Sequence, residues 1–568
     1  MSGAPLVIGA LAAFIAGYLV YGRYIAGLVG LKPERPTPAH TLNDGIDYVP
    51  AKPQILLGHH FSSIAGAAPI IGPITAAVFG WVPVYLWILF GGIFLGSVHD
   101  FTALVASIRH QGRSIGEVID RRLGRTAKIL FLSFAWATLI LVIAVFTNAV
   151  ALTFHKVPEA GTASSLLIAS AVLFGLAVYR FKAPLNIATI VGIGLIGVTL
   201  IVGHHLPLRL SVTEWKFVLL AYIFIASVTP VWILLQPRDF LNSFLLYALM
   251  IAGIVGTVVV NPTLTMPAFT GFSSDIGPLF PTLFVTVACG ALSGFHSLVA
   301  SGTTSKQLDS EAHAKPISMG AMLIESLLAV IAMITASMLT PDAYQSQIHH
   351  GAVPIFARGI GGFATITGLS LAAGITFASV SVAEFALTSL DTATRISRFA
   401  FAELIQPRAD ATGPLAKLRG RFSQNRFLAT TVTVVTGGAV ALSGSERAIW
   451  PIFGAANQML ASLAFLAVLV WLVHIGRRSF FVLIPTIFTF IVTLGALGFL
   501  TLSFWQKGQW PLAILSLALG ILALVLLREA IGGLSRAHAL RGTEADDEDD
   551  LPDTRANLPG PPRDKDGR

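Results

Sequence analysis

The chain has 568 residues, of which 54% are hydrophobic and 12% are charged, and its mean hydropathy is +0.77. A soluble globular protein of this length cannot bury so much apolar surface, so the composition indicates a polytopic membrane protein. The net charge of +8 comes from basic residues in short loops, which excludes nucleic-acid binding, and the single cysteine, Cys289, excludes a disulfide framework or a thiol redox motif.

Apolar runs long enough to cross a hydrocarbon core of about 30 Å, which takes about 20 residues each, recur about fifteen times. The first run, from Pro5 to Gly30, lacks a basic leading segment and a small-residue cleavage site, so we expect a retained helix rather than a signal peptide. The predicted spans of this all-α protein centre on residues 5–30, 60–80, 82–107, 127–152, 163–180, 185–204, 215–236, 243–266, 277–300, 317–340, 360–390, 427–445, 448–475, 479–503 and 511–530.

Lysine and arginine gather in alternate loops between these runs, most densely in 109–128 and 391–426. The positive-inside rule therefore predicts that the basic loops are cytoplasmic. Residues 541–568 are acidic and rich in proline and glycine, which is typical of a disordered tail. We expect four parts: the first span and a cytoplasmic loop (1–57), a transport core (58–400), a loop and peripheral spans (401–535), and a disordered cytoplasmic tail (536–568).

The segment GHHFSSIAGAAPIIGP, residues 58–73, interrupts the second predicted span with glycine and proline. Proline removes a backbone donor, and in lipid the freed groups are satisfied by protein or a water-lined cavity, so a broken membrane helix usually borders a site. The sequence predicts a substrate-binding helix in a transporter. Its candidate binding residues are His59, His60, Ser62, Ser63 and Gly66.

A second predicted break lies at Pro230, within the segment SVTPVWILLQPRDFLN, where Thr229 can bond the freed carbonyl groups. LeuT-like transporters contain two repeats of five spans in opposite orientations, and each repeat begins with a broken helix. Spans two to six and seven to eleven would be the repeats. Thr229 with Ser293 and His296 of the ninth span would then complete the pocket.

Several segments resemble, in order, the signature segments of the carbon-starvation protein A (CstA) family of bacterial inner-membrane proteins. They are GHHFSSIAGAAPIIGP, GSVHDF, PVWILLQPRDFLN, CGALSGFH, SGTTSKQL, LDTATR and PIFGAANQ. The resemblance implies a LeuT-like fold, a multi-pass protein of the bacterial inner membrane, and uptake of peptides during carbon starvation or proton-driven uptake of pyruvate.

Ionisable groups in predicted spans are candidates for ion coupling because burying them in lipid is costly. His99 with Asp100 is compatible with a proton relay or with an ion pair to Arg109 or Arg113. The other coupling candidates are Glu384, Lys306, Thr303 and Thr304; Lys306 is equally compatible with an ordinary cytoplasmic lysine.

The gate candidates follow the second predicted break. Gln236, Arg238 and Asp239 are expected to close the inner mouth through an Arg–Asp pair, and a salt bridge that serves only folding is the alternative. With these parts, the sequence predicts a symporter of a small carboxylate substrate, peptide or pyruvate, driven by protons, with Na⁺ as the alternative coupling ion. We expect no enzymatic chemistry and no cofactor, and the oligomeric state is left open.

Two other classes of protein fit the same residues. One is a membrane redox protein that holds haem or a divalent metal through His59, His60 and His296, with His99 as a further haem ligand, because imidazole coordinates metals readily. The other is a nutrient sensor that binds the ligand without moving it, for which the basic loop 391–426 offers the only sizeable cytoplasmic surface.

Overall fold

The computed structural model describes residues 1–539 except residues 46, 231, 408–412 and 444–445. In this part of the chain eleven helices are long and apolar enough to cross a membrane, and one bent pair raises the number to twelve. The predicted tail lies outside the described residues from residue 540 onward. An all-helical polytopic membrane protein is therefore confirmed.

The described residues up to Val260 form thirteen α-helices. They are α1 (Gly3–Ala16), α2 (Gly22–Val29), α3 (Pro38–Thr41), α4 (Pro53–Ile64), α5 (Ala68–Ala76), α6 (Trp81–Gly91), α7 (Ser97–Arg109), α8 (Ile115–Leu123), α9 (Arg125–Lys156), α10 (Pro158–Gly175), α11 (Leu185–His205), α12 (Val212–Val228) and α13 (Leu235–Val260). Short π-helical turns join α1 to α2 and α6 to α7, so each pair forms one span, Gly3–Val29 and Trp81–Arg109.

The second half begins with a small β-ribbon and continues as helices. Its elements are β1 (Ser273–Ser274), β2 (Gly277–Pro278), α14 (Leu279–Thr286), α15 (Ala288–Ala291), α16 (Gly294–Gly302), η5 (Thr304–Lys306), η6 (Glu311–His313), η7 (Lys315–Gly320), α17 (Ala321–Ser337), α18 (Pro341–Ile348), α19 (Ala352–Ala364), η8 (Thr365–Thr367), α20 (Leu371–Ile405), α21 (Pro414–Gln424), α22 (Arg426–Leu442), α23 (Glu446–His474), α24 (Phe480–Gln506) and α25 (Trp510–Ala539).

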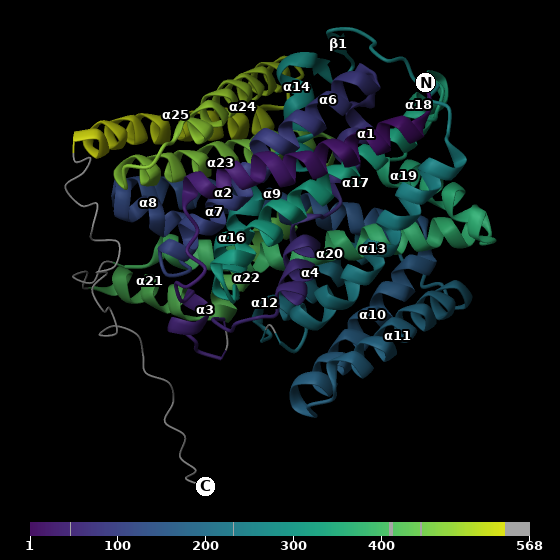
Figure 1. The fold of residues 1–568 in the computed structure, drawn as a ribbon, viewed down its shortest axis with the longest axis horizontal. Coiled ribbons are helices and arrows are strands. Elements are labelled where there is room, and N and C mark those ends of the chain that lie inside the picture. The colour runs from purple at the N-terminus through teal and green to yellow at the C-terminus, as the bar shows by residue number, and fades with distance from the viewer. Residues whose placement is uncertain (46, 231, 408–412, 444–445, 540–568) are drawn as a thin grey trace.

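The helices are arranged in central and peripheral layers (Figure 1). In their most apolar stretches, 94% of the α23 span and 89% of the α17 span are buried, against 22% of α11 and 28% of α25. In Figure 1, α24 and α25 run along the upper edge and α10 with α11 forms a hairpin at the lower right. Large aliphatic side chains point outward from these peripheral helices, whereas carboxylates such as Asp100 and Glu384 are fully buried. This inverted distribution suits a protein surrounded by lipid.

The described residues contain eleven or twelve helices that are long and apolar enough to cross a membrane, fewer than the about fifteen spans expected. Helices α12 and α22 have 17 residues each, so at 1.5 Å per residue they are about 26 Å long, shorter than a hydrocarbon core of about 30 Å. The predicted span 277–300 is divided among the three short helices α14, α15 and α16. Hydropathy measures how apolar a segment is and does not register where its helix stops.

The predicted break after His59 and His60 is confirmed. Helix α4 ends at Ile64, α5 begins at Ala68, and the two are bent by 44°. Backbone approaches backbone closely beside this break: a Cβ at Gly72 would meet the carbonyl oxygen of Thr286 at 2.5 Å. Glycine at this position therefore lets α5 pack directly on the end of α14.

The second break is not where the sequence predicted it. Pro230 lies in the connection between α12 and α13, and α13 is long enough to span a membrane by itself, so the prediction of one span broken at Pro230 is wrong. The second interrupted segment is α14–α16, where Leu292 and Ser293 adopt extended backbone between α15 and α16. Helices α5 and α15 pack together, as do α4 and α16, so the two interrupted segments face each other.

Candidate functional site

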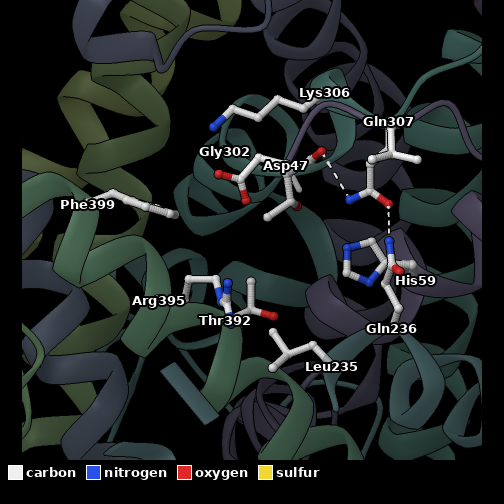
Figure 2. A pocket seen from close by; sticks show the side chains of 12 residues that line it. Asp47, His59, Leu235, Gln236, Gly302, Lys306, Gln307, Thr392, Arg395 and Phe399 are labelled. Atoms are coloured by element: carbon white, nitrogen blue, oxygen red, sulfur yellow. Dashed lines mark hydrogen bonds between the residues drawn. The ribbon is translucent and has the colours of Figure 1, made fainter. Parts of the chain in front are cut away.

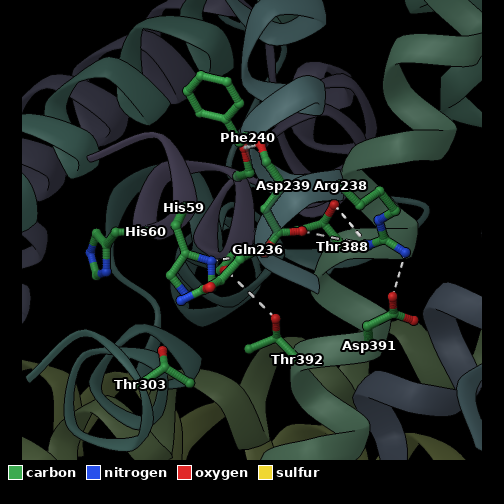
Figure 3. Close-up of polar contacts among 12 residues, drawn as sticks. His59, His60, Gln236, Arg238, Asp239, Phe240, Thr303, Thr388, Asp391 and Thr392 are labelled. Atoms are coloured by element: carbon green, nitrogen blue, oxygen red, sulfur yellow. Dashed lines mark hydrogen bonds and ion pairs between the residues drawn. The ribbon is translucent and has the colours of Figure 1, made fainter. Parts of the chain in front are cut away.

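The two adjacent imidazoles of α4 point in different directions (Figure 3). His59 Nδ1 lies 2.8 Å from Asp239 Oδ2 at the start of α13, and His60 Nδ1 lies 2.8 Å from Thr304 Oγ1 after α16. Consecutive helical residues point about 100° apart, which explains why the two rings separate. Both side chains are buried, so α4 is held from two sides by polar contacts.

The last turn of α4 forms hydrogen bonds with α13 and α20. Ser62 Oγ donates to the Asp239 carbonyl at 3.3 Å, and Ser389 Oγ of α20 donates to the Ser63 carbonyl at 3.0 Å. A Cβ on Gly66 would meet Ser389 Oγ at 2.6 Å, so the break itself touches α20. Ser62 and Ser63 lie at the carbonyl end of α4, and the amide end at this break belongs to α5.

Four side chains from α7, α16 and α17 form what we call the imidazole–carboxylate cluster: His99, Asp100, His296 and Glu325. The Nδ1 atoms of His99 and His296 lie 2.9 and 2.8 Å from the two oxygens of Asp100. His296 Nε2 lies 3.3 Å from Glu325 Oε2. All four side chains are 0–1% exposed. Sequence reasoning found three of them and missed Glu325, although a glutamate in the apolar run 317–340 is the signal of an intramembrane ionisable group.

The alternative for His99 and Asp100, an ion pair with a basic-loop arginine, is wrong. Arg109 pairs with Glu311 at 2.9 Å, and Arg113 pairs with Glu117 at 2.7 Å. Ser293, at the break before α16, accepts a hydrogen bond of 3.0 Å from the Asn457 amide of α23. The Asn457 oxygen accepts from the Phe295 amide at 2.9 Å, so Asn457 caps the first turn of α16.

A second buried set, which we call the arginine network, surrounds Arg238 of α13. Its guanidinium contacts Asp391 of α20 and the Tyr222 hydroxyl of α12, and it donates to Thr388 Oγ1 at 3.0 Å. Tyr222 also donates to Asp391 at 2.7 Å. The expected Arg238–Asp239 gate is not the main pairing, because these groups are 3.7 Å apart and Asp239 binds His59. Tyr222, Thr388 and Asp391 were not predicted as site residues.

Glu384 joins the arginine network through Asn242. The Asn242 amide donates to Glu384 Oε2 at 3.0 Å and to Thr388 Oγ1 at 3.2 Å. Thr229 lies apart from the α4 break: its hydroxyl donates to the Ile225 carbonyl of α12 at 2.7 Å, and its own carbonyl accepts from Arg395 at 2.5 Å.

A small cavity lies beside α4 (Figure 2). Its volume is about 30 Å³, room for only a few water molecules. Gln236 and Gln307 bond each other across it at 3.2 Å, and the Lys306 ammonium lies 5.4 Å from the Tyr48 ring centre and 5.5 Å from that of Phe399. The remaining lining residues are Asp47, Val49, His59, Leu235, Gly302, Thr303, Thr392 and Arg395.

The three imidazoles considered as ligands of a shared metal or haem each contact a different side chain through Nδ1: His59 contacts Asp239, His60 contacts Thr304 and His296 contacts Asp100. Across the described residues, no group of three or more histidine, cysteine, aspartate or glutamate side chains is arranged to hold a metal ion.

Comparisons with known proteins identify relatives over most of the chain. It is 33% identical to the peptide transporter CstA of Campylobacter jejuni, over 87% of this chain and 80% of that protein. It is 32% identical to the peptide transporter CstA of Escherichia coli, over 89% of this chain and 81% of that protein. It is 31% identical to the pyruvate/proton symporter BtsT of Escherichia coli, over 87% of this chain and 81% of that protein. These relatives are transporters rather than enzymes.

Among solved structures, the chain matches an Eremococcus coleocola manganese transporter in complex with an aromatic bis-isothiourea substituted compound. The TM-score is 0.44 and the identity 14%, over 87% of this chain and 99% of that one. The sequence profile described as carbon starvation protein CstA matches residues 2–350 and 345–496. The chain therefore belongs to the carbon starvation protein CstA family, as its signature segments indicate.

Proposed function

We propose that this CstA-family transporter is a secondary active importer that carries a small carboxylate nutrient, either a short peptide or pyruvate, together with protons. The observation that carries the proposal is the pair of interrupted helices, α4–α5 and α14–α16, facing each other in the interior. Interrupted helices present unpaired backbone groups, which is how many transporters bind polar substrates at the membrane midplane. The names of the peptide and pyruvate relatives support the substrate class.

Helix packing supports a five-plus-five inverted repeat with revised boundaries. The first repeat consists of α4–α5, α6–α7, α9, α12 and α13, and the second of α14–α16, α17, α20, α22 and α23. The corresponding helices α12 and α22 are short members, with 17 residues each. Corresponding members pack against each other: α5 on α15, α6 on α17, α9 on α20, and α12 on α22. Helices α10 and α11 are then a hairpin inserted in the first repeat.

The substrate carboxylate binds at the amide end of α5, beside Gly66. A helix amino terminus carries a partial positive charge, and α5 has no side chain that caps it. Ser389 of α20 and Phe146 of α9 approach the same glycine. Ser293 and Asn457 line the opposing break.

Access alternates when α4 moves relative to α13, α16 and α20. The small cavity marks the inner mouth, closed by the Gln236–Gln307 bond and by Lys306. Figure 1 supports the cytoplasmic assignment of this end, because α3, which precedes α4, lies towards the same side as α8 and α21 of the basic loops.

Uptake of labelled pyruvate and a labelled dipeptide into proteoliposomes tests the proposal. We expect accumulation of one of them under an inward proton gradient, and none under an inward sodium gradient or without a gradient. The matched control is the Gly66→Leu variant, whose side chain would collide with Ser389 and fill the break. Failure of the wild-type protein to accumulate either compound under any gradient would contradict the proposal.

A further inference from the structure

The imidazole–carboxylate cluster contains two acids and two imidazoles but no fixed cation. Asp100 accepts hydrogen bonds from His99 and His296, whereas neither oxygen of Glu325 has a hydrogen-bond partner. In the part of the chain that the structure describes, no lysine or arginine bonds any of these four side chains. The charge of the cluster therefore depends on how many protons it holds.

Burial makes the fully deprotonated cluster unfavourable. With both acids ionised and both imidazoles neutral, two negative charges would lie in a region that is 0–1% exposed. Taking an ion out of water costs several kcal/mol unless a partner compensates it. Asp100 is compensated by two N–H donors, but Glu325 has only the Nε2 atom of His296, at 3.3 Å. A proton placed between these two atoms removes the uncompensated charge.

The arginine network differs in this respect. Arg238 carries a permanent positive charge and contacts Asp391, and the Asn242 amide donates to Glu384. These acids have donors that do not depend on pH. Helix α4 contacts the neighbour of Arg238 through His59, which is directed towards Asp239, whereas His60 is directed towards Thr304.

The position of the Glu325–His296 pair connects it to both interrupted segments. His296 lies in the first turn of α16, directly after the break at Ser293, and Glu325 lies on α17, which packs against α4 and α5. The other titratable groups that face the pair are His99 and Asp100 on α7, His60 on α4 and the Cys289 thiol on α15. A change of charge here acts on the helices that must move during transport.

We propose that the Glu325–His296 pair binds the transported proton. This inference rests on the proposed proton-coupled function. The proton is held between Glu325 Oε2 and His296 Nε2 in the closed protein and leaves as H⁺ when α4 and α16 separate. Asp100 stays ionised and orients His296 through Nδ1, so that Nε2 faces Glu325.

Transport by the Glu325→Gln variant is the first test. Glutamine keeps the shape of the side chain and removes its proton. We expect the variant to exchange labelled substrate for unlabelled substrate across the membrane but to lose accumulation under a proton gradient. The matched control is Glu403→Gln on α20, where the carboxylate accepts from Ser114 at 3.2 Å, away from the cluster; this control keeps proton-driven accumulation.

Proton-driven accumulation by Glu325→Gln would overturn the inference. Loss of accumulation in Glu384→Gln together with its retention in Glu325→Gln would assign the proton to the arginine network instead. A Glu325→Gln variant that fails to fold is recognised by its elution from size exclusion, and the second measurement then uses His296→Gln.

Infrared spectroscopy of the purified protein gives a readout that does not need transport. The wild-type protein should show a protonated-carboxyl band that disappears as pH rises. We expect Glu325→Gln to lose that band, His296→Gln to shift the pH at which it disappears, and Glu403→Gln to keep it. An unchanged band in both cluster variants would overturn the inference. A wild-type protein that shows the band but accumulates no substrate would instead contradict the proposed function.

Discussion

Asp391 compensates a guanidinium that has almost no access to water, since the Arg238 side chain is 1% exposed. Asp391→Asn removes the carboxylate in direct contact with this buried charge and leaves only that of Asp239, at 3.7 Å; breaking a buried pair costs about 3–5 kcal/mol. We expect a correspondingly lower free energy of unfolding in denaturant titrations of the purified protein. Asp309→Asn is the control, because the His40–Asp309 pair is 46% and 45% exposed and should change stability by less than about 1 kcal/mol. Equal losses in both variants would contradict this account.

Because His110, at the end of α7, is buried, we expect the free energy of unfolding to depend on pH. Burial lowers its pKa from 6.5 to about 4, while its Nδ1 atom lies 2.7 Å from the Ala106 carbonyl. The unfolded chain takes up the proton near pH 6.5 and the folded chain only near pH 4, so stability is lost as pH falls through this interval. From pH 7 to pH 5 the loss is about 2 kcal/mol. His110→Gln should remove that part of the pH dependence in denaturant titrations, and identical curves for both proteins would refute it.

The sequence identified individual polar residues where an ionisable group lies in an apolar run, but it did not identify the residues that they contact. His99, Asp100 and His296 were recognised because ionisable groups are costly in lipid. The bond between Asp100 and His296 joins residues separated by 196 positions. Only the packing of α7 against α16 brings them together, so a single sequence carries no local signal for the pairing.

At the scale of elements, two arginines of α20 stabilise the end of α12. Arg395 donates to the carbonyls of Ala226 and Thr229 at 3.1 and 2.5 Å, and Arg398 donates to that of Ser227 at 3.0 Å. These carbonyls have no partner within the helix, and cations suit a helix carboxyl end.

Arg395→Ala should lower the free energy of unfolding by about 2–3 kcal/mol, because it removes charge-assisted bonds to buried carbonyls. Thermal unfolding of the purified protein measures the loss. Arg419→Ala is the matched control, since Arg419 also donates to a carbonyl, that of Ile405 at 3.1 Å, but at an exposed position. A stability loss in the control as large as that of Arg395→Ala would argue against the cap.

Breaks in helices were predictable only where proline marks them and packing agrees. The α4–α5 break follows from Pro69 and its glycines, whereas Pro230 falls between two separate helices. The interruption at Leu292 and Ser293 contains no proline, and the sequence there remains apolar. Asn457 and the neighbouring helices stabilise it through tertiary contacts, which hydropathy cannot detect.

For the whole molecule, alternating access predicts that the only cysteine of the chain reports on substrate. Cys289 is buried beside the break of α14–α16, 3.3 Å from the Asn457 amide. Its alkylation requires the bundle to open, so bound substrate should slow it, by about tenfold at a concentration ten times Kd. The control is Ser346→Cys on the exposed part of α18 in a Cys289→Ala background, whose rate of alkylation should be the same with and without substrate. Alkylation of Cys289 that ignores saturating substrate would contradict a site between the two breaks.

Composition was sufficient to predict a polytopic helical membrane protein, but not the number of spans. Helices α12 and α22 are as apolar as their neighbours and are simply shorter. Their lengths are set by the caps at their ends, such as the Ser211–Glu214 capping box of α12 and Asn425 before α22. A hydropathy window averages over these single residues.

The shallow burial of α11 has a consequence for how the sequence can vary. Most of its surface, including Ile190 and Ile201, contacts nothing within the chain and meets lipid instead. Lipid tails impose no shape on the side chains they surround, so one aliphatic residue can replace another there without creating a void. The identity of α23 residues, in contrast, is fixed by neighbours on every side. Helix α11 is thus free to diverge in sequence as long as its residues remain apolar.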